Sequence, residues 1–357
     1  MKKTILVTGG AGFIGSNFII HMLQNSASFR EAKIINLDKL TYAGNLENLK
    51  QVESNPNYEF IEGDICDKKL VDNVFQNHEI DYVVNFAAES HVDRSIQTPE
   101  IFVKTNVLGT ATLLNSAKSK WLLDEETDSY RAGVKFLQVS TDEVYGSLGE
   151  SGFFTEETKL CPRSPYSASK ASADLLALAY YETFKFPVNI TRCSNNYGPF
   201  QFPEKLIPLV LNNLASGADL PIYGDGLNVR DWLFVEDHCR AIELVLEKGV
   251  LGQVYNVGGK NEKTNLELVQ TVVKSFEKLK SCKTCSKIKH IVDRKGHDRR
   301  YAIDPSKIEQ ELGFKPSVSF ENGIEKTVDW FLKNADWLEN VVSGDYKYYY
   351  KNKYGNI

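Results

Sequence analysis

The sequence predicts an α/β protein built on a doubly wound parallel sheet, with a smaller C-terminal domain. Two observations predict this fold class. Short apolar runs rich in valine and isoleucine alternate with amphipathic stretches of helix length through the first half of the chain. The runs are apolar throughout, as expected of parallel strands that helices cover on both faces.

Six strands and four helices are expected to alternate in the first domain. The apolar runs predict strands over 4–9, 33–38, 58–64, 81–88, 135–140 and 187–192. The amphipathic stretches predict helices over 14–25, 68–78, 100–119 and 166–184. These elements give a first domain over residues 1–196, with a segment near 229–258 returning to it. A second domain mainly over 197–357 has expected helices at 204–216, 236–249 and 264–279.

Composition and charge exclude several classes of protein. The chain has 357 residues and a net charge of -5, which argues against general binding to nucleic acid or to anionic membranes. The first apolar run is too short for a signal peptide, and no stretch has the length of a membrane span, so the cytoplasm is the expected location. The pair Cys282 and Cys285 lacks a second pair of ligands, so no metal site is expected.

A glycine-rich turn predicts a dinucleotide site. The segment TILVTGGAGFIGSNF places Gly9, Gly12 and Gly15 between a strand and a helix, where the backbone turns tightly and approaches a pyrophosphate. Asp38 ends the next strand, where its carboxylate can bind a ribose diol and would repel a 2'-phosphate. The sequence therefore predicts a Rossmann domain that binds NAD in preference to NADP.

Further residues at strand ends are expected to line the cofactor site. Asp64 follows the third strand and could reach the adenine, while small residues follow the fourth strand beneath the cofactor. The remaining expected contacts are Phe13, Ile14, Ile65, Ala87 and Ala88.

A second motif predicts catalysis. Tyr166 and Lys170 share one face of a helix that is expected to begin at Pro165. A phenol is a poor base until an ammonium group, together with a cationic nicotinamide ring, stabilises the phenolate, so the pair is expected to lower the pKa of Tyr166. Just before this helix, STDEVYG places Asp142 and Glu143 side by side at a strand end. Successive strand residues face opposite sides, so both acids can serve one ligand only if the strand has ended there.

The chain resembles the extended short-chain dehydrogenase/reductase superfamily, in its nucleotide-sugar branch. TGGAGFIG, the Tyr166 and Lys170 pair and the length all match over nearly the whole chain. The stretches STDEVYG, AAESHVDRS, RCSNNYGPFQFPEKLIP, YGDGLNVRDW and GHDRRYAIDP are similar to the 4,6-dehydratases of that branch.

The resemblance implies dTDP-glucose as substrate and an elimination of water. Tyr166 would take the proton of the 4-hydroxyl, aligned by Thr141, while hydride passes to NAD. Glu143 would then remove the proton on carbon 5, and Asp142 would protonate the leaving 6-hydroxyl. Hydride return to carbon 6 regenerates NAD and leaves a 4-keto-6-deoxy sugar, the precursor of deoxysugars such as rhamnose.

The resemblance also implies how an acidic protein holds a nucleotide diphosphate. Cations and polar groups, mainly of the second domain, would surround it, with His91 and Arg94 near the cofactor end. Thymine and uracil both remain open as the base. The expected contacts are His91, Arg94, Asn196, Glu204, Lys205, Tyr223, Arg230, Asn265, Arg294 and His297. A homodimer is implied as well.

Two alternatives remain open at this point. A UDP-sugar 4-epimerase or a decarboxylase could use the same scaffold, but an epimerase needs no carboxyl pair and a decarboxylase would leave Asp142 idle. A catalytically silent NAD-binding regulatory protein is the other alternative. It would need none of the five groups expected to be catalytic, which are Thr141, Asp142, Glu143, Tyr166 and Lys170.

Overall fold

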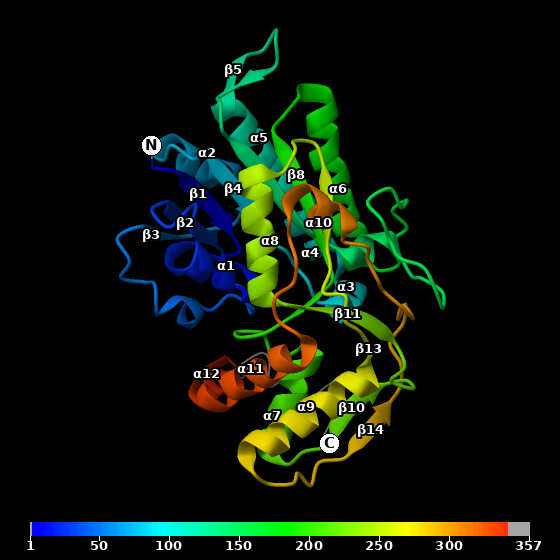
Figure 1. Cartoon of the computed structure of the whole chain (residues 1–357). Coiled ribbons are helices and arrows are strands. Elements are labelled where there is room, and N and C mark those ends of the chain that lie inside the picture. Colours follow the sequence, from blue (N-terminus) through cyan, green and yellow to red (C-terminus); the bar gives the residue numbers. More distant parts are fainter. Residues whose placement is uncertain (1, 342–357) are drawn as a thin grey trace.

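The computed structural model describes residues 2–341, and the tyrosine-rich tail noted in the sequence lies outside the described residues. The main sheet has seven parallel strands in the order β3-β2-β1-β4-β7-β8-β12 (Figure 1). In that order the strands are β3 (Tyr58–Glu62), β2 (Lys33–Asp38), β1 (Thr4–Thr8), β4 (Tyr82–Asn85), β7 (Lys135–Thr141), β8 (Val188–Cys193) and β12 (Val254–Val257). The predicted doubly wound parallel sheet is confirmed.

Helices cover both faces of the sheet, as the apolar strands require. One face packs against α1 (Phe13–Gln24), α8 (Val235–Lys248) and α10 (Ser306–Leu312). The other packs against α2 (Lys68–Asn77), α5 (Thr110–Trp121) and α6 (Pro165–Phe184). The start of α6 at Pro165 confirms the prediction, and a reciprocal capping box between Ser164 and Ser167 fixes that start.

The helix predicted over 100–119 is interrupted. The chain forms α3 (Val92–Gln97), α4 (Pro99–Phe102) and the π-helical turns η2 (Val103–Gly109) before α5 begins. Asn106 of η2 accepts a hydrogen bond from the Glu89 backbone N–H at 2.8 Å and donates one to the Glu89 carbonyl at 3.0 Å. Apolar spacing alone does not separate a π-helical segment from an α-helix, so the sequence could not predict it.

The second part of the molecule lies below the carboxyl edge of the sheet in Figure 1. Its apolar cluster joins strands and helices from across the C-terminal half. Its elements are β9 (Asn195–Tyr197), α7 (Leu206–Ser216), β10 (Leu220–Tyr223), β11 (Val229–Phe234), β13 (Glu262–Thr264), α9 (Asn265–Lys280), β14 (Ile288–Ile291), α11 (Phe320–Lys333) and α12 (Ala335–Val341).

The chain crosses between the two parts more than once. Within the segment expected to return, β11 pairs with β9 and β13 in a separate three-stranded sheet, whereas α8 and β12 belong to the main sheet layer. At the far end, Trp337 of α12 donates a hydrogen bond to Asn48 in η1 (Leu46–Leu49), at 2.8 Å. The boundary at residue 196 stays a prediction.

Two surface segments complete the description. A hairpin of β5 (Leu122–Asp124) and β6 (Ser129–Tyr130) follows α5. Cys282 and Cys285 are exposed free thiols after α9. Among the residues described, no helix combines the length and apolar character needed to cross a membrane.

Candidate active site

A pocket of about 460 Å³ opens where strands of the main sheet end, facing the second part of the molecule. Residues after β1, β2, β3, β4, β7 and β8 line one wall, because the carboxyl ends of parallel strands meet at the same edge. All the residues predicted for catalysis and cofactor binding line this pocket, and so do all the predicted substrate contacts except Arg94. The pocket volume lies in the range usual for ligand-binding sites.

The glycine turn forms the cofactor end of the pocket. Gly9 has φ +68, and a Cβ there would lie 2.7 Å from the Ala87 nitrogen. A Cβ on Gly15 would lie 2.3 Å from the Gly9 carbonyl oxygen, so only glycine lets the helix approach the turn. Gly12 precedes α1, and that helix has no acid in its first turn to repel a phosphate. This cradle fits a pyrophosphate.

Two carboxyl groups lie where the ribose and adenine of a dinucleotide are expected. Asp38 ends β2 and accepts hydrogen bonds from the backbone N–H groups of Ala11 and Leu40, both at 2.9 Å. Burial raises its pKa, against those hydrogen bonds. For Asp64, burial raises the pKa, but hydrogen bonds from Lys39 and Cys66 outweigh it and the net pKa is lowered. The carboxyl groups of Asp38 and Asp64, together with the glycine turn, fit NAD.

The two carboxyl groups predicted to be catalytic follow directly from the end of β7. The strand ends at Thr141, and a 3₁₀ turn, η3 (Asp142–Tyr145), begins at the next residue. The Thr141 hydroxyl caps this turn by accepting a hydrogen bond from the Glu143 N–H at 3.2 Å. Asp142 and Glu143 both line the pocket, which confirms that the strand has ended before them.

The surroundings of the two acids differ. Asp142 is 1% exposed, and its Oδ2 has no hydrogen-bond partner among residues 2–341. Burial, the Glu143 charge and Asp231 raise the pKa of Asp142 well above its usual value. Burial also raises the pKa of Glu143, but Arg294, Lys205 and Arg230 oppose that rise. Of the two carboxyl groups, Asp142 is therefore the one that its surroundings favour more strongly in the protonated form.

Tyr166 and Lys170 face the carboxyls from the first turns of α6. Burial, followed by the charge of Glu143, raises the pKa of Tyr166, and a hydrogen bond with Thr141 opposes this. The expected lowering is therefore not produced by the protein groups, because burial and nearby negative charge outweigh the hydrogen bond with Thr141. Burial lowers the pKa of Lys170, whose Nζ donates to the Val139 carbonyl at 2.6 Å.

A polar cluster near α3 forms one side of the pocket. Lys205 donates to the Ser90 carbonyl at 3.1 Å, and His91 Nε2 lies 3.9 Å from a Glu204 oxygen. Burial raises the pKa of Glu204. Arg94 does not line the pocket: its guanidinium lies 3.8 Å from the Tyr42 ring centroid, and the Tyr42 hydroxyl donates to Glu204 at 3.1 Å. Arg94 also influences the pocket by its charge, because burial raises the pKa of Glu89 and Glu204 and the Arg94 charge opposes that rise.

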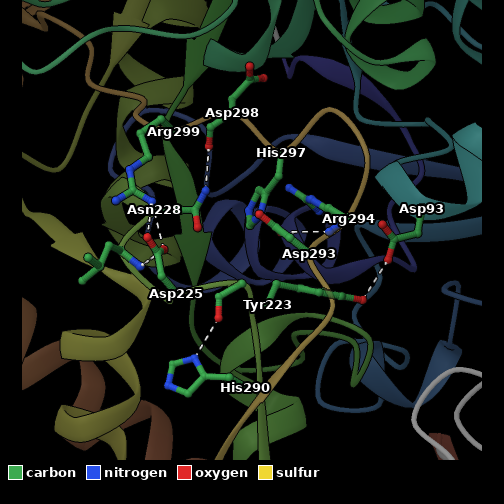
Figure 2. A network of polar contacts seen from close by, with 12 residues as sticks. Asp93, Tyr223, Asp225, Asn228, His290, Asp293, Arg294, His297, Asp298 and Arg299 are labelled. Atoms are coloured by element: carbon green, nitrogen blue, oxygen red, sulfur yellow. Dashed lines mark hydrogen bonds and ion pairs between the residues drawn. The ribbon is translucent and has the colours of Figure 1, made fainter.

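The opposite side carries aromatic and cationic groups (Figure 2). Tyr223 extends across the view toward Asp93, and its hydroxyl lies 3.3 Å from an Asp93 oxygen. His297 contacts Asp293 at 2.6 Å, while burial and the charge of Arg294 lower the pKa of His297 to about 4. Arg230 donates to the Asp298 carbonyl at 2.9 Å and stacks on the Tyr301 ring at 4.2 Å.

Two more predicted contacts come from element ends. Asn196 of β9 lines the pocket, and its side-chain oxygen lies 2.9 Å from His238 Nδ1. Asn265 begins α9, and its N–H donates to the Asn228 carbonyl at 3.0 Å.

Sequence reasoning missed several residues of the pocket wall. They are Glu89, Cys193, Ser194, Gln201 and Tyr301. Glu89 and Tyr301 stand in the stretches AAESHVDRS and GHDRRYAIDP, so the motifs pointed to them, but no spacing rule selects those positions.

The fold and the site define a dinucleotide-binding enzyme of the extended short-chain dehydrogenase/reductase class, with two carboxyl groups added to its tyrosine and lysine. Residues 6–327 match the family model described as GDP-mannose 4,6 dehydratase. A dTDP-glucose 4,6-dehydratase of Xanthomonas campestris pv. campestris is 52% identical, over 96% of this chain and 97% of its own. One from Escherichia coli is 47% identical, over 96% of this chain and 97% of its own.

Solved structures of dTDP-glucose 4,6-dehydratases are also similar to this chain. A dTDP-glucose 4,6-dehydratase from Bacillus anthracis, in complex with NAD, has a TM-score of 0.83 and 51% identity, covering 95% of this chain and 99% of its own. The one from Streptomyces venezuelae, with NAD and TYD bound, has a TM-score of 0.85 and 48% identity, covering 95% and 99%. The chain belongs to the 4,6-dehydratase family, and within it to the dTDP-glucose 4,6-dehydratases.

Proposed function

We propose that this chain converts dTDP-glucose to dTDP-4-keto-6-deoxyglucose and water. The observation that carries this proposal is the pair Asp142 and Glu143, which lines one pocket with Tyr166 and Lys170 and has surroundings that favour different protonation states. An elimination needs a group that gives a proton and another that takes one. The names of the relatives support the same reaction.

NAD fits the end of the pocket where the glycine turn and the Asp38 carboxylate lie. Gly9, Gly12 and Gly15 would hold the pyrophosphate with the N-terminus of α1, and Asp38 would hold the ribose diol. NAD, when bound, supplies reversible hydride transfer. The other residues assigned to this cofactor are Phe13, Ile14, Asp64, Ile65, Ala87, Ala88, Tyr166 and Lys170.

Tyr166 is assigned as the base for the 4-hydroxyl of the sugar. Its phenol is buried, so ionisation needs positive charge nearby, and Lys170 provides an ammonium one helical turn away. Thr141 lies at the end of β7, where its hydroxyl can bond the same sugar oxygen and hold it against Tyr166. Loss of the hydroxyl proton, together with transfer of the hydride on carbon 4 to NAD when it is bound, would leave a ketone that acidifies the hydrogen on carbon 5.

Glu143 and Asp142 are assigned to the elimination. Three cations near Glu143 favour its carboxylate, which can accept the proton from carbon 5. Burial and the neighbouring charge keep the Asp142 carboxyl protonated, so it can donate to the 6-hydroxyl as that group leaves as water. The two acids would thus supply the acceptor and the donor that the elimination requires, Glu143 taking one proton and Asp142 giving another.

The nucleotide diphosphate is assigned to the cationic wall. Lys205, Arg230 and Arg294 would neutralise the phosphates, and His297 and Tyr223 flank them. His91, Asn196, Glu204 and Asn265 are the remaining assigned contacts. Arg94 is assigned a supporting role behind Tyr42 rather than a direct contact.

An epimerase or a decarboxylase is a weaker reading of the same site. Neither reaction uses an acid that protonates a leaving hydroxyl, whereas Asp142 is buried at the pocket with one oxygen free of hydrogen bonds among residues 2–341. A silent regulatory protein would need no such set of groups.

A homodimer in the cytoplasm is the assembly we propose. Large apolar side chains are exposed on neighbouring elements α3, η2 and α6, a pattern that suits a helical interface between copies. They include Ile96, Val103, Leu108 and Leu175, exposed by 40%, 56%, 55% and 56%.

A turnover comparison tests the function. The purified protein is given dTDP-, UDP-, GDP- and CDP-glucose without added NAD, and the products are separated by chromatography. We expect a 4-keto-6-deoxy sugar, formed fastest from dTDP-glucose. Epimerised sugar would support the epimerase instead, and an inert protein that retains NAD would support the regulatory reading.

A further inference from the structure

A charged pair is buried behind the catalytic residues. Arg192 of β8 is 2% exposed and Asp174 of α6 is 0% exposed. The Arg192 Nε donates to Asp174 Oδ2 at 2.9 Å. Buried ion pairs often contribute no more to stability than apolar side chains of the same volume, because desolvation offsets their attraction. Stability alone therefore does not explain this pair.

On one side, the pair is connected to the catalytic helix. Tyr166, Lys170 and Asp174 follow one another at intervals of four residues, so they share one face of α6. Burial lowers the pKa of Lys170, and the Asp174 carboxylate is the first group that opposes this lowering. Asp174 thus helps Lys170 stay charged inside the protein.

On the other side, the pair is connected to the turn that carries the two acids. Arg192 Nη1 donates to the Tyr145 hydroxyl at 3.0 Å, and its guanidinium lies 4.9 Å from the Tyr145 ring centroid. That hydroxyl in turn donates to Asn256 of β12 at 2.8 Å. Tyr145 ends η3, the turn that begins at Asp142. Arg192 is therefore bonded to both catalytic elements at once.

We propose that Tyr145, Asp174 and Arg192 form a buried bracket that positions the acids of η3 relative to Tyr166 and Lys170. None of the three lines the pocket, so they act as positioning residues. The proposal rests on the proposed function, because it assigns a role in coordinating the two halves of that reaction. Proton removal from the 4-hydroxyl and elimination across carbons 5 and 6 occur on one sugar, so the two sets of groups must keep a fixed separation.

The substitution Tyr145→Phe tests the bracket with the smallest change. It keeps the ring, which stacks on Phe154 at 5.1 Å, and removes the hydroxyl with its two hydrogen bonds. The matched control is Tyr255→Phe, because the buried Tyr255 hydroxyl also makes two hydrogen bonds, with the Val250 N–H and Glu311, away from the pocket. Both variants should lower the thermal midpoint by about 2 to 4 °C.

Only Tyr145→Phe should affect catalysis. We expect its kcat on dTDP-glucose to fall about 10-fold or more with KM changed little, because the acids are displaced from the reacting carbons. In a single turnover, the near-ultraviolet absorbance of the reduced nicotinamide ring should persist longer than in the native enzyme or in Tyr255→Phe. Equal kcat in the two variants would overturn the proposal.

A second variant tests the other end of the bracket. Asp174→Asn keeps the shape of the side chain and removes the charge that supports Lys170, so the pH profile of kcat should lose its alkaline side at lower pH than in the native enzyme. An unshifted profile in a folded Asp174→Asn protein would contradict the bracket. Native enzyme that makes no ketosugar would instead remove the proposed function, so the two failures are distinguishable.

Discussion

The negative charge of Glu143 adds to burial in raising the pKa of its neighbour Asp142. Burial also raises the pKa of Glu143, but the charges of Arg294, Lys205 and Arg230 oppose that rise. The two neighbouring carboxyl groups thus differ in how strongly their surroundings oppose ionisation.

Replacing Asp142 should stop the loss of water from the sugar while leaving substrate binding intact. For Asp142→Asn we expect kcat for the ketosugar to fall about 100-fold or more, with KM near the native value, because the amide cannot protonate the leaving oxygen. Initial rates of product formation measure this. A variant with native kcat would show that another group gives the proton.

The pH dependence follows from the same pair. Asp142 works protonated and its pKa is raised, so native kcat should fall as the pH rises through that pKa. Glu143 works ionised, so kcat should also fall as the pH drops through the raised pKa of Glu143. Rates measured across pH, with Glu143→Gln as the comparison, check whether the acidic side of the profile disappears.

The glycine cradle predicts a strong difference between two alanine substitutions. In Gly15→Ala the new Cβ would meet the Gly9 carbonyl at 2.3 Å, so we expect a loss of about 1 to 3 kcal/mol in unfolding free energy and a lower NAD content after purification. Gly149→Ala is the control, since a Cβ there meets nothing within 4 Å. Equal NAD content in the two variants would argue against the cradle.

Lys135 predicts an unusual dependence of stability on pH. Its Nζ donates to the Val245 and Gly249 carbonyls, and burial lowers its pKa to about 8 from 10.5. Between those values the unfolded chain binds the proton that the folded chain has lost, so the unfolding free energy should rise with pH, by up to about 3 kcal/mol. Below the folded pKa both states are protonated, and the cost of burying the charge is fully present.

The variant Lys135→Met isolates that contribution. Denaturant unfolding at several alkaline pH values should give a flatter dependence for the variant than for the native protein. Parallel curves would mean that other groups cause the rise.

Arginines on and behind the pocket wall should differ in their effect on KM. Arg94→Ala removes a cation–π contact with Tyr42, so we expect KM for dTDP-glucose to rise only about 2- to 5-fold. Arg294→Ala removes a cation from the wall and should raise KM about 10-fold or more. A larger effect from Arg94→Ala would place that side chain on the ligand after all.

Structural features that depend on the residues of a single segment could be predicted from the sequence. Apolar runs located six of the seven strands of the main sheet, and local chemistry located the end of β7 before Asp142 and the start of α6 at Pro165. The position of the pocket could be predicted from these strands, because the carboxyl ends of parallel strands lie at the same edge of a sheet.

Relationships that depend on long-range packing could not be predicted. Arg192 stands inside an apolar strand, and its partner Asp174 lies on a helix 18 residues earlier, where no spacing rule joins them. Arg94 looked like a ligand contact by resemblance, but Tyr42, far from it in sequence, holds it behind the wall. The raised pKa of Tyr166 depends on burial, which the motif does not reveal.

The last strand of the main sheet comes from beyond the second sheet in the sequence, since β12 pairs with β8 and β11, which precedes β12, pairs with β9. A ribosome must therefore synthesise the chain to Val257 before the edge of β8 can be covered, and a fragment ending near residue 196 would expose that edge to other chains. Neither part of the molecule is a contiguous piece that could be exchanged for a homologous domain by a single cut.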